Sequence, residues 1–147
     1  MKKFAFSLDK VLDFKEQTLE NKNNEMAKLQ SDLRELERKI DDCNFQFAQT
    51  NQKMVTALET GLSALDMASY KTYLQEINLN TKKLINQKFE LVKFIDQKMA
   101  VILELKTDIS GLEKLKDKKF SEYSKLIQKE QELALEEFVN KTRYNAV

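Results

Sequence analysis

The chain has 147 residues, with 25 basic and 24 acidic side chains, no Pro, no His, two Gly and one Cys. A net charge of +1 gives no general electrostatic attraction to nucleic acid or to an anionic membrane. Because the chain lacks His and has no Gly-rich loop for a phosphate, we expect no catalytic, cofactor-binding or metal-binding residue and no enzymatic activity.

Long helices are the structure that this composition favours. One third of the residues are charged, and the apolar residues are spread evenly along the chain instead of gathering in blocks. Alternating runs of Val, Ile and Thr between turn residues, which would indicate strands, are absent. The fold class expected is all-α.

The first expected helix covers about residues 8–58. Steps of three and four residues from Leu8 reach apolar side chains at eleven of fourteen positions. These positions are Leu8, Leu12, Lys15, Leu19, Lys22, Met26, Leu29, Leu33, Leu36, Ile40, Cys43, Phe47, Thr50 and Met54. A period of 3.5 residues is typical of a coiled-coil seam. Cys43 lies on this stripe, where we interpret it as a small buried apolar side chain and not as a reactive thiol.

A turn is expected at about residues 59–66. Gly61 can adopt the left-handed conformation that ends a helix, and Ser63 can cap the helix that follows.

The second expected helix covers about residues 67–140. Its stripe consists of Tyr70, Leu74, Ile77, Leu84, Leu91, Ile95, Ile102, Leu105, Ile109 and Leu112, with interruptions at Thr81, Lys88 and Lys98. Two stripes joined by a short turn bury each other best when the helices are antiparallel. Residues whose numbers sum to roughly 124 should then face each other, with Leu8 near Lys116. We therefore expect residues 1–147 to form a single domain, a long two-helix antiparallel coiled-coil hairpin.

This register leaves about 30 C-terminal residues without a partner helix, up to ~45 Å of helix. The overhang still carries Phe120, Tyr123, Leu126, Ile127, Leu133, Leu135, Phe138 and Val139. Exposed apolar residues at helical spacing usually mark an interaction site. A basic run at residues 114–119 is either a solvated face or a contact for an acidic protein. The run lacks interleaved aromatic or Arg residues, so it does not predict nucleic-acid binding.

A second group of bulky residues lies just after the turn. Tyr70, Tyr73 and Ile77 occupy adjoining parts of one helical face. They can form a contact site for a partner or simply pack the turn, and the first interpretation is stronger for Tyr73, which is off the stripe.

Two regions resemble the flagellar export chaperone FliJ family. The N-terminal region reads FAFSLDKVLDFKE over residues 4–16. The C-terminal region has LEKL at residues 112–115, Tyr123, and KEQELALEE at residues 129–137. A heptad pattern does not require Phe4 and Phe6, which makes the first match more specific.

The resemblance implies a non-enzymatic, cytoplasmic component of the flagellar type III export apparatus, at the inner face of the cell membrane near the flagellar base. Its fold would be similar to the stalk of the rotary ATPase gamma subunit. Such a protein binds the pore of the hexameric export ATPase, promotes its assembly and activity, links it to the export-gate membrane protein, and can escort export chaperones. We expect an isolated monomer that does not insert into the membrane, because the longest apolar run, residues 99–103, is too short to span it.

The two ends of the hairpin would then have different partners. The ATPase end would use Phe4, Phe6, Lys119, Phe120, Tyr123, Ile127, Glu130, Gln131, Leu133 and Glu136. The export-gate site would be Tyr70, Tyr73 and Ile77. The alternatives are a structural coiled-coil scaffold that dimerises through its overhang, and the equivalent stalk of a non-flagellar type III secretion system.

Overall fold

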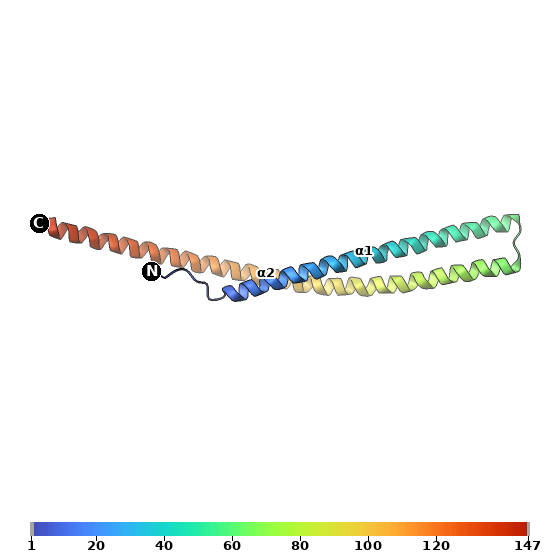
Figure 1. The fold of residues 1–147 in the computed structure, drawn as a ribbon, viewed down its shortest axis with the longest axis horizontal. Helices are drawn as coiled ribbons and strands as arrows, with labels where there is room; N and C mark the ends of the chain where they lie inside the picture. The colour runs from blue at the N-terminus through green and yellow to red at the C-terminus, as the bar shows by residue number, and fades with distance from the viewer. Residues whose placement is uncertain (1, 147) are drawn as a thin grey trace. The chain divides into compact units, whose positions relative to one another are not determined.

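The computed structural model describes residues 2–146. It contains two long helices that pack against each other, α1 (Asp9–Thr60) and α2 (Ala64–Ala146), and no strand among the described residues (Figure 1). The all-α two-helix hairpin is therefore confirmed. The chain divides into two compact units. The turn unit is Asn21–Ile102, and the terminal unit is formed by the described residues up to Glu20 together with those from Leu103 onward.

The turn between α1 and α2 is shorter than the sequence suggests, since only residues 61–63 lie outside the helices. Gly61 has a φ of 100°, which only glycine adopts without strain, and it ends α1. The hydroxyl of Ser63 accepts a hydrogen bond from the backbone N–H of Asp66 at 3.1 Å. Both features were expected from the sequence and are confirmed. The Ser63 hydroxyl accepts a hydrogen bond from a backbone N–H group of the first turn. Because of this cap, α2 starts at Ala64 and not near residue 67.

The predicted stripes form the seam between the helices. Every α1 stripe position from residue 12 to residue 54 is buried or half-buried, and the same holds for every α2 stripe position from residue 70 to residue 112. Cys43 is 8% exposed, as its stripe position predicts. The buried seam side chains are distributed along both helices, from Leu12 and Met26 on α1 to Ile102 and Ile109 on α2. The hydrophobic contribution to stability is therefore spread along the seam and not concentrated in a central core.

In the turn unit, the lysines that interrupt the α2 stripe reach carboxylates on α1. Lys98 Nζ lies 2.6 Å from Glu25 Oε2, and Lys88 Nζ lies 3.6 Å from Glu37 Oε1. The residue numbers of these pairs sum to 123 and 125, so the predicted register of roughly 124 is confirmed in this unit.

The terminal unit has the same arrangement. Lys15 Nζ lies 3.0 Å from Asp108 Oδ2, and Lys116 Nζ lies 2.8 Å from Asp9 Oδ1. Here too the sums are 123 and 125, in agreement with the predicted register. The apolar stems of seam lysines can cover the seam while their charged ends reach carboxylates at its edge.

Candidate protein-binding surfaces

The N-terminal segment packs on α2 in the terminal unit. The ring of Phe4 lies 5.2 Å from the ring of Phe120 and 5.5 Å from that of Tyr123, measured between centroids. The Tyr123 hydroxyl donates a hydrogen bond to the backbone oxygen of Lys2 at 2.7 Å. Phe6 is only 7% exposed. We call the four residues Lys2, Phe4, Phe120 and Tyr123 the aromatic clasp.

The clasp confirms that Phe4 lies at the start of the C-terminal overhang. The aromatic side chains of the N-terminal segment and of α2 differ in exposure. The ring of Phe6 is buried, whereas Phe120 remains 53% exposed and is accessible to a partner. Phe4 and Tyr123 are half-buried. The predicted position of Phe4 is confirmed, whereas the burial of Phe6 was not expected from the sequence.

Beyond Ile127, nothing in the described part of the chain buries α2. Every residue from 128 to 145 is exposed. Among them, Leu133 is 50% exposed and Phe138 is 67% exposed. Four residues predicted for the ATPase end lie on this stretch, namely Glu130, Gln131, Leu133 and Glu136, while Ile127 is half-buried at its beginning. We call residues 128–145 the free helix end.

Lys119 lies beside the clasp and not on the free helix end. Its ammonium group is 3.7 Å from Glu122, and both side chains are more than half exposed. An ion pair of this kind is screened by water and salt and contributes about 0–1 kcal/mol. Lys119 is therefore available to exchange Glu122 for a carboxylate of a partner.

The turn unit contains an open groove between α1 and α2 close to the turn, with a volume of about 740 Å³. Tyr70 and Tyr73 line it from α2, and Gln46, Gln49 and Thr50 line it from α1. Tyr73 is 47% exposed. We call this hollow the tyrosine groove.

Ile77 does not reach the tyrosine groove. It is 6% exposed and packs in the seam, so the structure brings Tyr70 and Tyr73 together but separates Ile77 from them. The α1 residues of the groove were missed by the sequence reasoning. The antiparallel register could have predicted them, because residue numbers that sum to roughly 124 place Tyr73 opposite residues close to Thr50.

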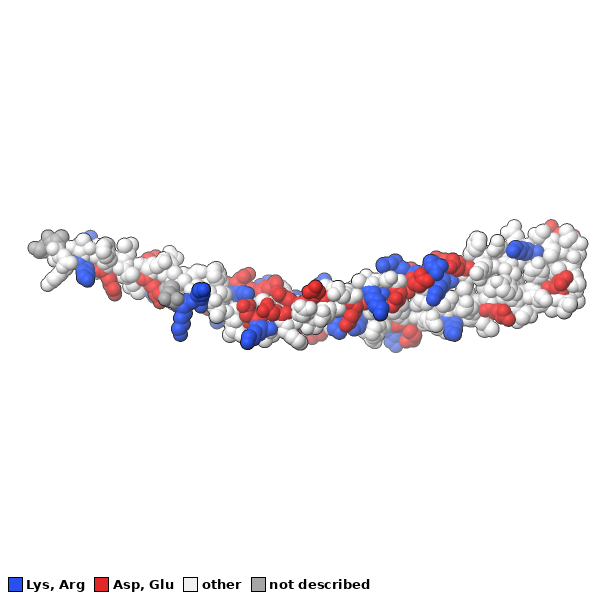
Figure 2. Space-filling model, viewed as in Figure 1, with Lys and Arg blue, Asp and Glu red and all other residues white. Residues whose placement is uncertain are grey.

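The region around the turn is poor in charge. Residues 43–81 contain five charged side chains, Lys53, Glu59, Asp66, Lys71 and Glu76, whereas 33% of the whole chain is charged. Figure 2 shows this difference, since the atoms around the turn are mostly white. Depletion of charge distinguishes the centres of protein interfaces from ordinary surface.

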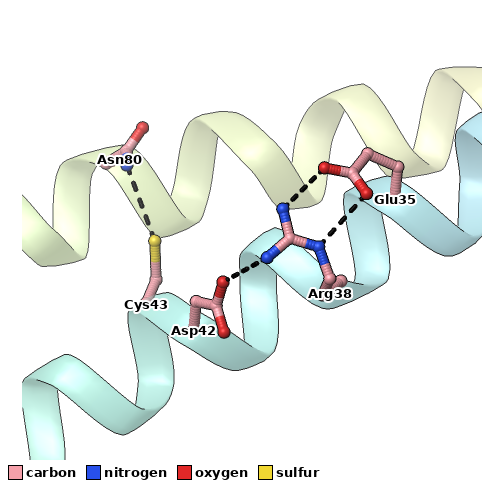
Figure 3. Close-up of polar contacts among 5 residues, drawn as sticks. All are labelled: Glu35, Arg38, Asp42, Cys43 and Asn80. Atoms are coloured by element: carbon pink, nitrogen blue, oxygen red, sulfur yellow. Dashed lines mark hydrogen bonds and ion pairs between the residues drawn. The ribbon is translucent and has the colours of Figure 1, made fainter.

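Polar contacts elsewhere in the turn unit lie within α1 and across the seam (Figure 3). Arg38 donates to Glu35 at 2.6 and 3.1 Å and to Asp42 at 2.8 Å, along one exposed face of α1. The hydrogen bond from Arg38 lowers the pKa of the Glu35 carboxyl. Cys43 accepts a hydrogen bond from the Asn80 amide at 3.5 Å across the seam. Spacings of three and four residues explain the first cluster as local helix stabilisation.

The part of the chain that the structure describes holds no group of three or more Cys, Asp or Glu residues arranged to bind a metal ion. Within those same residues, no helix is both long enough and apolar enough to cross a membrane. The candidate protein-binding surfaces among these residues are the aromatic clasp with its free helix end, and the tyrosine groove.

Comparison with known proteins identifies one family. The family model described as Flagellar FliJ protein matches residues 4–146, nearly the whole chain. No curated protein and no solved structure matches.

Proposed function

The chain belongs to the flagellar FliJ protein family, and from this premise we propose that it is the central stalk of the hexameric export ATPase. Membership makes the protein a component of the flagellar export apparatus. Members of this family are structural or chaperone-type export components, and the family is not a known enzyme family. The finer role, in which the stalk promotes assembly and activity of the ATPase, is our proposal.

The observation that supports the stalk role is the free helix end. Eighteen consecutive residues, 128–145, are exposed and carry large apolar side chains such as Leu133 and Phe138. A helix with exposed apolar side chains needs a surface to cover, and the pore of a protein ring provides one. The aromatic clasp at its base adds Phe4, Phe120 and Tyr123 to the same surface, with Lys119 at its edge.

We propose that the turn unit makes the second contact, to the export-gate membrane protein. Tyr70 and Tyr73 supply aromatic side chains at the tyrosine groove, and aromatic residues are enriched in interface centres. Ile77 contributes by holding α2 against α1 beneath them. A protein that binds both partners would sit in the cytoplasm at the inner face of the cell membrane, near the flagellar base. We also propose that the protein escorts export chaperones, which would share the surface of the turn unit with the export gate.

Stimulation of the export ATPase tests the stalk role. Leu133→Glu places a charge on the free helix end, and we expect it to reduce stimulation by about tenfold or more, because an uncompensated charge inside an interface is costly. Leu79→Glu is the matched control, since Leu79 is 66% exposed and lies in the turn unit. Equal stimulation by both variants would contradict the proposal.

A further inference from the structure

The tyrosine groove exists because the seam is filled by smaller side chains near the turn. Thr50 occupies a stripe position that holds Leu8, Leu29 and Leu36 in earlier heptads, and Ala57 continues the stripe with a single methyl group. A second hollow of about 430 Å³ shares Gln49, Lys53 and Tyr70 with the groove. The helices therefore leave Tyr70 accessible between two hollows instead of closing over it.

Seven of the nine residues that line the groove are uncharged. Gln46 and Gln49 supply amide groups, Thr50 and Ser69 supply hydroxyls, and the two tyrosines supply aromatic surface. Lys53 and Asp66 are the charged side chains of the lining, and their charges are opposite. The surrounding residues 43–81 carry a net charge of −1, from two lysines and three acidic residues.

This lack of charge restricts what can bind. A strongly acidic or basic segment would meet one attractive and one repulsive charge at Lys53 and Asp66, so the loss of its hydration in the groove would have no net compensation. An uncharged segment meets no such cost. Its backbone N–H and C=O groups can bond to the glutamine amides, and an apolar side chain can pack on the tyrosine rings.

We infer that the tyrosine groove binds an uncharged segment of a protein partner, which places an apolar or aromatic side chain against Tyr70 and Tyr73 and bonds its backbone to Gln46 and Gln49. The inference rests on the proposed function, which makes the export-gate membrane protein the partner. It adds the chemistry of the gate segment and the α1 residues that recognise it. Binding at this end of the protein is then driven by apolar contact and neutral hydrogen bonds, and it depends little on ionic strength.

The test is calorimetric titration of the full-length protein with the purified cytoplasmic domain of the export-gate membrane protein, at about 50 mM and about 500 mM salt. We expect Kd to change by less than about threefold between the two salt concentrations. Gln46→Glu should weaken binding by about tenfold or more, because it adds a charge to the groove. Gln75→Glu is the matched control. Gln75 is exposed on α2 in the same unit but does not line the groove, so its variant should bind within about twofold of the wild type.

The outcomes separate the inference from the proposed function. If the wild-type protein does not bind the gate domain at either salt concentration, the gate role itself fails. If it binds but high salt weakens binding tenfold, or if the two glutamine variants bind equally, the gate role stands and the inference is overturned. Gln49→Glu repeats the test should circular dichroism show that Gln46→Glu is misfolded.

Sedimentation with phosphatidylcholine vesicles tests whether the groove binds a lipid surface instead of a protein. We expect the protein to stay in the supernatant. Co-sedimentation that Gln46→Glu abolishes and Gln75→Glu preserves would assign the groove to a lipid surface and contradict a protein partner.

Discussion

The ring of Phe4 stands edge-on to the ring of Phe120, with the centroids 5.2 Å apart and the planes at 77°. This edge-to-face geometry is a favoured arrangement of aromatic rings. It joins the N-terminal segment, which is not helical, to α2 at the base of the free helix end. Phe4 also contacts the ring of Tyr123, and the first prediction concerns that second contact.

A double-mutant cycle of Phe4→Ala and Tyr123→Ala should show coupling of about 0.5–1.5 kcal/mol in the free energy of unfolding, measured by urea titration. The physical reason is the contact between the two rings, whose centroids are 5.5 Å apart. Tyr144→Ala is the control for the second change, because Tyr144 is 85% exposed. Additive effects of Phe4→Ala and Tyr123→Ala would show that the clasp is not formed in solution.

The two residues Tyr73 and Ile77 should respond in opposite ways to truncation. Ile77→Ala removes a buried seam side chain and should lower the free energy of unfolding by about 2–4 kcal/mol. Tyr73→Ala should change stability by less than about 1 kcal/mol, since Tyr73 is half exposed, but should weaken binding of the gate domain. Thermal unfolding and calorimetry measure the two effects. Loss of stability in both variants would mean that Tyr73 also packs the turn.

The ion pair between Glu25 and Lys98 should make stability depend on pH in a specific direction. The hydrogen bond from Lys98 lowers the pKa of Glu25 below its ordinary value of 4.5, and the bond to Glu25 raises the pKa of Lys98 above 10.5. The depressed pKa of Glu25 makes its contribution present above pH 4.5 and lost as the pH falls through the folded-state value. The raised pKa of Lys98 makes its contribution present below pH 10.5 and lost as the pH rises through the folded-state value.

Glu25→Gln should therefore lower the unfolding midpoint between these limits, and the difference from the wild type should disappear in acid. Glu76→Gln, at another exposed carboxylate of the turn unit, is the control. A difference for Glu25→Gln that persists unchanged at acid pH would rule out the ion pair as its cause.

The isolated protein should be a monomer that unfolds in one cooperative transition, as expected of a single domain. Its seam already pairs the two apolar stripes within one chain, so a second copy is not needed to cover them. Analytical ultracentrifugation measures the association state. A dimer that is lost when residues 128–147 are deleted would instead favour the scaffold that dimerises through its overhang.

The sequence predicts those parts of the structure that are periodic or that depend on special backbone chemistry. The 3.5-residue stripes fix the buried faces, Gly61 and Ser63 fix the turn, and the turn position fixes the register. These features follow from local rules, because each needs only a few residues at defined spacing.

The sequence does not reveal the contacts that arise only after the helices are paired. Phe4 and Phe6 precede the heptad pattern, so no period indicates that one ring is buried and the other meets Phe120. Gln46 and Gln49 are polar residues without a motif, and they become part of a groove only because α2 brings Tyr70 and Tyr73 beside them. Ile77 lies on the stripe, and the structure buries it there, which leaves Tyr73 as the exposed member of the predicted gate site.

Stimulation of the export ATPase by a protein that ends at Ile127 tests the stalk proposal most directly. This truncation removes the free helix end but keeps Phe4, Phe120 and Tyr123, so the aromatic clasp and the seam remain intact. We predict that the truncated protein unfolds at the same temperature as the full chain but no longer stimulates the ATPase. Full stimulation by the truncated protein would contradict the account.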